Sequence, residues 1–176
     1  MNKKNVLLFS LGLIALGVLG RLAPHLWNAT PLGAIALFAA SYFGLRMSLP
    51  VTLSILFITD LAIGFYDWRI MASVYASFAL AAILGRLTSR SRAPYKVGLA
   101  VLGSSTLFFL ATNLAVWQFG TMYPHTLSGL ADSYIAALPF FRNSIIGDSM
   151  YALALFGSYE LYLSLRPSAA KGAVAA

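Results

Sequence analysis

The chain has 176 residues, of which 60% are hydrophobic and only 10% are charged. Soluble domains are about 45–50% apolar and about 25% charged, so this composition argues against a soluble globular domain and against a disordered chain. The sequence contains no cysteine, which excludes disulfides, thiolate metal sites and cysteine nucleophiles. The net charge is +7, and in so apolar a chain its distribution points to a membrane rather than to nucleic acid.

Six apolar segments follow one another along the chain. A helix needs about 20 mostly apolar residues to cross a bilayer. The second segment is short for a crossing unless protein covers its ends. The segments are Val6–Leu22, Leu32–Leu45, Leu49–Tyr66, Ile70–Leu87, Val97–Phe119 and Pro139–Leu165.

Between the fifth and sixth segments, apolar residues from Leu127 to Leu138 fall at helical spacing. This spacing predicts a short helix in the membrane interface, or an ordinary surface-loop helix, before the last crossing. The predicted fold is therefore all-α: an integral membrane bundle of six transmembrane helices. Residues 1–166 form a single transmembrane domain and residues 167–176 a disordered C-terminal tail.

Lysine and arginine indicate the orientation, because they accumulate on the cytoplasmic side of membrane proteins. With the N-terminus in the cytoplasm and six crossings, nine of the 12 basic residues lie inside, and both termini are cytoplasmic. Only Arg21, Arg69 and Arg142 then lie outside. We predict a multi-pass protein of the inner (plasma) membrane of the cell.

Small residues recur at every fourth position in two of the segments. Ser73, Ser77, Ala81 and Gly85 form such a stripe in the fourth segment, and the second segment has a similar one from Ala36 to Gly44. Small residues let membrane helices approach closely. These stripes pack helices of this chain together, or they dock a partner membrane subunit.

Polar residues from different segments fall in the same outer half of the membrane. An ionisable side chain in hydrocarbon is costly unless it is paired or hydrated, so we expect a cavity that opens outward. There these groups pair with one another, as Arg21 or Arg142 with Asp60 or Asp148, or bind a ligand. The alternatives are structural ion pairs, helix caps and an interfacial tryptophan belt. The candidate ligand-binding residues are Arg21, His25, Asn28, Asp60, Asn113, Trp117, Arg142, Asn143 and Asp148.

Several of these residues stand in short motifs. They include Arg-Leu-Ala-Pro-His at 21–25, Asn-Ala-Thr-Pro at 28–31, Thr-Asn at 112–113, Leu-Pro-Phe-Phe-Arg-Asn at 138–143 and Gly-Asp at 147–148. With these motifs the chain resembles the S components, the substrate-binding subunits of energy-coupling-factor vitamin transporters. More closely it resembles a set of uncharacterised bacterial membrane proteins thought to share that fold. The resemblance implies an outward-facing pocket for a vitamin-like molecule, and docking to a coupling membrane subunit that carries ATPases.

The expected function is therefore membrane transport, as in vitamin uptake, with a small organic molecule bound in the outward-facing pocket. The alternative is a structural or assembly subunit of a larger membrane complex. An intramembrane enzyme is the weakest hypothesis, because His25 and His125 have no serine partner at a recognisable motif spacing. We expect no enzymatic activity, no cofactor, no metal site and no nucleic-acid partner. The lipid bilayer, the ligand and the coupling subunit are the expected partners.

Overall fold

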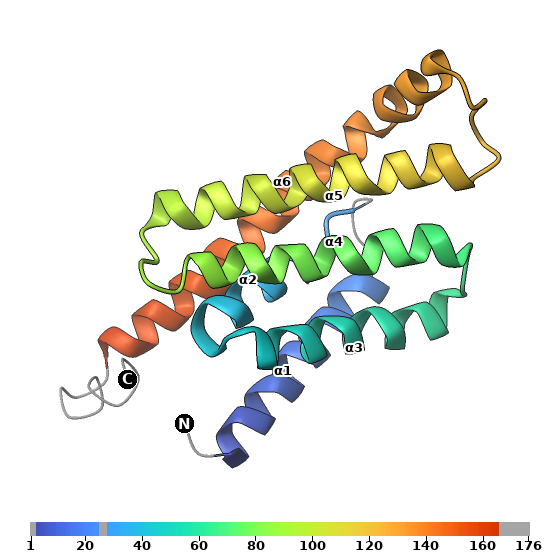
Figure 1. Ribbon diagram of the computed structural model, residues 1–176. Coiled ribbons are helices and arrows are strands. Elements are labelled where there is room, and N and C mark those ends of the chain that lie inside the picture. Colours follow the sequence, from blue (N-terminus) through green and yellow to red (C-terminus); the bar gives the residue numbers. More distant parts are fainter. Residues whose placement is uncertain (1–2, 25–27, 166–176) are drawn as a thin grey trace.

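Figure 1 shows the computed structural model, which describes residues 3–24 and 28–165. This part of the chain is all-helical, as predicted. The predicted tail at 167–176 and the candidate residue His25 lie outside the described residues. The helices are α1 (Lys3–Leu22), α2 (Leu32–Phe43), α3 (Leu45–Ile63), α4 (Trp68–Leu87), α5 (Pro94–Phe119) and α6 (Leu127–Ser164).

Four of these helices, α1, α3, α4 and α5, are long and apolar enough to cross a membrane. Their outer surfaces carry large apolar side chains, such as Leu19, Leu61 and Leu99, that are exposed in the isolated chain. Apolar surface on this scale is unfavourable in water and is the ordinary surface of a helix in lipid. Four helices could therefore span a membrane, which is consistent with a membrane protein.

The second helix does not have the length of a crossing. With 12 residues, α2 spans only about 18 Å, against about 30 Å of hydrocarbon. Its residues Leu32 to Ser41 are all buried, and it contacts each of the other five helices. It ends at Gly44, whose φ of 81° lies in the left-handed region that favours glycine, and α3 begins at the next residue. The predicted second crossing is thus not confirmed, because α2 is a short helix within the core.

The last helix is longer than predicted. The separate helix expected before Pro139 is not present, because its residues form the first turns of the 38-residue helix α6. A proline removes one backbone hydrogen bond, whereas ending a helix in apolar surroundings leaves several backbone groups without partners. The helix therefore continues through Pro139. At its start the Thr126 hydroxyl accepts a hydrogen bond from the Gly129 amide at 3.1 Å, a regular N-terminal cap.

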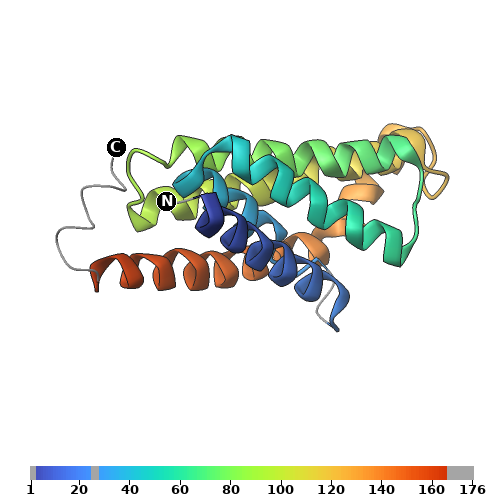
Figure 2. The same ribbon diagram turned by 90° about the horizontal axis from the view of Figure 1, so that it is seen from below.

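The arrangement leaves α2 enclosed by the longer helices. Helices α3, α4 and α5 lie side by side, and α1 and α6 cross them on one side with α2 between (Figures 1 and 2). The α2–α4 contact is close, because a Cβ added at Gly85 would lie 2.3 Å from the Leu37 carbonyl oxygen. The small residues Ala36 and Ala40 also pack against α4. Both small-residue stripes are thus used inside the chain.

Candidate functional site

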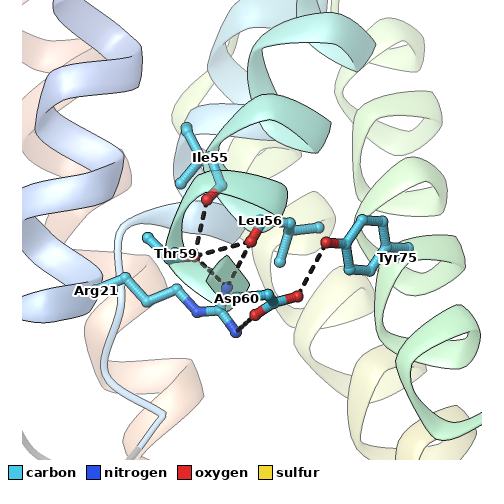
Figure 3. Close-up of polar contacts among 6 residues, drawn as sticks. All are labelled: Arg21, Ile55, Leu56, Thr59, Asp60 and Tyr75. Atoms are coloured by element: carbon cyan, nitrogen blue, oxygen red, sulfur yellow. Dashed lines mark hydrogen bonds and ion pairs between the residues drawn. The ribbon is translucent and has the colours of Figure 1, made fainter. Parts of the chain in front are cut away.

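A buried ion pair near the ends of α1 and α3 is also hydrogen-bonded to α4 (Figure 3). The Nη2 atom of Arg21, at the end of α1, lies 2.8 Å from Oδ1 of Asp60 near the end of α3. The Tyr75 hydroxyl of α4 donates a hydrogen bond to the other carboxylate oxygen, Oδ2, at 2.9 Å. The Arg21 guanidinium also donates to the Thr59 hydroxyl. Of the pairings that the sequence left open, the structure contains that of Arg21 with Asp60.

The Asp60 carboxylate is buried within these contacts. Its side chain is 1% exposed, whereas that of Arg21 is 17% exposed and reaches the neighbouring cavity. Both carboxylate oxygens of Asp60 have partners, and its side chain does not line that cavity. Asp60 therefore has a structural role, because its contacts hold α1 and α4 against α3.

A cavity of about 230 Å³ lies next to the ion pair, in the half of the bundle where α1 and α3 end and α4 begins. It is formed by the loop before α2, by the first turn of α2, and by facing sides of α4, α5 and α6. Residues far apart in the sequence thus meet at one depth. The lining residues are Arg21, Asn28, Thr30, Leu32, Gly33, Tyr66, Val74, Ser77, Phe78, Ala81, Ser104, Ser105, Phe108, Ser144 and Asp148.

Asp148 is the acidic residue of this cavity. It is 9% exposed, and its Oδ2 accepts a hydrogen bond from the Ser105 hydroxyl at 2.8 Å. It also accepts one from the backbone N–H of Ala34, in the first turn of α2. The approach to α2 requires a glycine, since a Cβ at Gly33 would lie 2.4 Å from Oδ1. The carboxylate thus satisfies a free amide at the start of a buried helix.

No basic side chain of the described chain forms an ion pair with Asp148. The one arginine that lines the cavity, Arg21, is already paired with Asp60. The cavity therefore contains a buried carboxylate held only by neutral donors. Arg142, which the sequence offered as an alternative partner, is exposed on α6.

Two loop residues complete the cavity wall. Asn28 has a φ of 64°, which asparagine tolerates better than most residues, and lies directly before the turn into α2. Tyr66 comes from the loop between α3 and α4. Burial, followed by the nearby Asp60 charge, raises the pKa of Tyr66. Its hydroxyl therefore keeps its proton at neutral pH.

A smaller cavity of about 70 Å³ adjoins the first and shares Asn28, Phe108 and Ser144 with it. Asn113 lines this smaller cavity. Its Nδ2 donates to the Phe109 carbonyl oxygen at 2.7 Å, so one amide hydrogen is used within α5. Of the candidate residues, the structure places Arg21, Asn28 and Asp148 at the larger cavity, and Asn28 and Asn113 at the smaller one.

The remaining candidates lie elsewhere. The Trp117 indole donates to the Pro124 carbonyl oxygen at 3.0 Å, and its ring packs against His125, so it fastens the turn between α5 and α6. Neither Arg142 nor Asn143 lines either cavity. The position of a residue along a helix predicts how deep it lies in the membrane. The rotation of the helix about its own axis decides whether the side chain faces the cavity, a neighbouring helix or lipid.

Sequence reasoning missed the serines of the cavity, above all Ser105 and Ser144, and also Gly33. A signal was present, because Ser104 and Ser105 interrupt the apolar run of α5. A serine in a membrane helix usually donates a hydrogen bond to the backbone of its own helix, however, which conceals a role in a cavity.

As for metals, the described residues contain no cluster of three or more His, Asp or Glu side chains that could hold an ion.

Comparison with known proteins gives one match. A family described as a family of unknown function (DUF6580) matches residues 1–170. No curated protein and no solved structure matches the chain. Since the match extends over nearly the whole sequence, the chain belongs to the DUF6580 family.

Proposed function

We propose that this chain is a membrane transport protein that binds a small organic molecule in an outward-facing cavity, in the manner of an S component. The observation that carries the proposal is the cavity of about 230 Å³ with Asp148 in its wall. A buried carboxylate without a basic partner costs several kcal/mol in stability, and a bound ligand that pairs with it would offset this cost. Small-molecule pockets are usually about 300–1,000 Å³, so the ligand is small.

The basic residues support an outward orientation of this cavity. Arg46 stands at the start of α3, and Arg86 and Lys96 flank the turn between α4 and α5, all at the end of the bundle opposite the cavity. The positive-inside rule makes that end cytoplasmic. The six helices then alternate in direction, with the short α2 covered by its neighbours. Both termini are cytoplasmic, and the protein resides in the inner membrane.

The alternative role, as a structural or assembly subunit, depended on small-residue stripes that could dock a partner. In this chain Ser77, Ala81 and Gly85 are buried, and Gly85 packs against Leu37 of α2. Intrachain packing therefore accounts for this stripe without a partner. A coupling subunit with ATPases, as the resemblance implies, would have to use another surface. The transport proposal does not require an enzymatic step.

The test is a ligand search on the purified protein. Small molecules that co-purify in mild detergent are released with solvent and identified by mass spectrometry, and a panel of vitamins and metabolites of every charge class is screened for thermal stabilisation. The proposal predicts at least one ligand that raises the melting temperature. Asp148→Asn abolishes this shift, whereas the matched change at the exposed Asp132 leaves it unchanged. The absence of any shift across the panel contradicts the proposal.

A further inference from the structure

We propose that the cavity binds a small organic cation, a protonated amine or a quaternary ammonium group, through the Asp148 carboxylate. This inference rests on the proposed function, because it names the ligand class of the same cavity. Its three supports are the charge balance of the site, the direction of the hydrogen bonds in its wall, and its size.

The charge balance leaves one negative charge uncompensated. Arg21 and Asp60 neutralise each other across a distance of 2.8 Å. Among the residues that the structure describes, Asp148 receives only neutral donors, the Ser105 hydroxyl at 2.8 Å and the Ala34 amide. The N-terminus of α2 adds at most about half a positive charge. A cationic ligand would compensate the remainder, whereas an anionic ligand would be repelled by the carboxylate in a medium of low dielectric constant.

The hydrogen bonds of the wall favour a ligand that donates. The Ser77 hydroxyl donates to the Ser73 carbonyl oxygen at 2.7 Å. Ser144 donates in the same way to Phe140 at 3.1 Å, and Ser104 donates to a carbonyl in α5. Since each hydroxyl has one proton, these oxygens can only accept further hydrogen bonds. These three serines therefore offer acceptors in the wall that Asp148 shares, which suits the N–H groups of a protonated amine, whereas Arg21, Asn28 and Tyr66 supply the donors of the wall.

The size and the apolar part of the wall fit a compact cation. A volume of about 230 Å³ corresponds to about eight water molecules at the liquid density of roughly 30 Å³ each. The rings of Phe78 and Phe108, whose centroids lie 5.1 Å apart, both line the cavity. Aromatic faces attract cations, and most strongly where water is excluded. A carboxylate beside aromatic rings in a small cavity thus favours an organic ammonium ion.

The first experiment varies only the charge of the ligand. Choline, its uncharged carbon analogue 3,3-dimethyl-1-butanol and the anion 3,3-dimethylbutanoate have similar shapes and form the first series. Ethanolamine, ethylene glycol and glycolate form the second series. Each compound is added at millimolar concentration to the wild-type protein in lipid nanodiscs, and the melting temperature and the binding isotherm are measured. The inference predicts stabilisation by the cation of at least one series and none by its neutral or anionic analogues. The inference is overturned if the neutral or anionic analogues stabilise the protein as much as the cations or more. It is also overturned if neither cation stabilises the protein.

The second experiment identifies the carboxylate. Asp148→Asn should weaken binding of the preferred cation by about 30-fold or more, the factor that corresponds to a loss of about 2 kcal/mol. Asp132→Asn, on the exposed face of the same helix, is the matched control and should leave binding unchanged. Ser105→Ala keeps the charge and removes one donor from it, so the cation should bind as tightly as before or more tightly. Equal cation binding by wild type and Asp148→Asn overturns the inference.

The two proposals fail in different ways. If an anion or a neutral metabolite stabilises the protein and no cation does, the cation inference is wrong and the transport proposal stands. If no compound of any charge class stabilises the protein in the wider screen, both are wrong.

Discussion

The Arg21–Asp60 pair should be worth more to stability than any exposed ion pair of this chain. In Arg21→Met, Asp60 remains buried at 1% exposure and loses its partner at 2.8 Å. Only the Tyr75 hydroxyl, at 2.9 Å, still donates to it. Breaking a buried pair from one side costs about 3–5 kcal/mol, because the remaining charge is left uncompensated. We expect the unfolding free energy of Arg21→Met to fall by this amount.

Removal of the other partner should cost less. In Asp60→Asn the Tyr75 hydroxyl keeps an acceptor, and Arg21 is 17% exposed and still donates to Thr59. The remaining cation can therefore be hydrated, and the expected loss is about 1–3 kcal/mol. The double variant with both changes contains no buried charge at this position. It should be more stable than the sum of the single losses predicts, with a coupling of about 2 kcal/mol.

Equilibrium unfolding in mixed detergent micelles, followed by circular dichroism, measures all four proteins of this cycle. The exposed pair of Arg69 with Asp67, at 2.9 Å, is the matched control, and its cycle should give a much smaller coupling. Additive losses at Arg21 and Asp60, or a larger loss for Asp60→Asn than for Arg21→Met, would show that the two side chains do not form a buried pair of this strength.

Two further predictions concern helix packing and pH. Gly85→Ala should lower the unfolding free energy by about 1–3 kcal/mol because the new Cβ would lie 2.3 Å from the Leu37 carbonyl oxygen, whereas Gly98→Ala, with open space around it, should be neutral or slightly stabilising. Equal effects in the two variants would contradict this packing. Hydrogen bonds from Arg69 lower the pKa of Asp67, which caps α4, to about 2. Since an unfolded aspartate titrates near pH 3.9, the cap stabilises the protein above that pH and its contribution disappears as the pH falls toward about 2. The melting-temperature difference between wild type and Asp67→Asn should shrink over this range, and a constant difference would contradict the assignment.

The sequence predicted most helices within a few residues of their observed bounds. Long apolar runs and the turn residues between them carry this information, as between Ile63 and Trp68. It did not predict that α2 lies in the core, because a helix rich in alanine and leucine has the same composition whether lipid or other helices surround it. The continuation of α6 through Pro139 was also missed, since the cost of ending a helix there depends on neighbours that only the folded chain supplies.

The candidate site was predicted in outline from depth along the helices. The positions of Arg21, Asp60 and Asp148 along their helices placed all three in one half of the bundle. These positions did not determine which of the two carboxylates forms the ion pair with the arginine. That choice depends on how each helix is rotated and on the short loop before α2. The same limitation explains why Trp117 was grouped with the cavity, although its indole bonds to the turn after α5.

We propose that water and small solutes reach the Asp148 cavity from outside the cell. The sequence contains no cysteine, so Ser144→Cys introduces a single thiol into the cavity wall. Ile146→Cys, exposed on the same helix, is the lipid-facing control. The rate of modification by a membrane-impermeant cationic thiol reagent is measured in intact cells and in inverted vesicles. We predict rapid labelling of the Ser144→Cys protein in intact cells and slow labelling of the Ile146→Cys protein. Labelling of Ser144→Cys only in inverted vesicles, or in neither preparation, would contradict the claim.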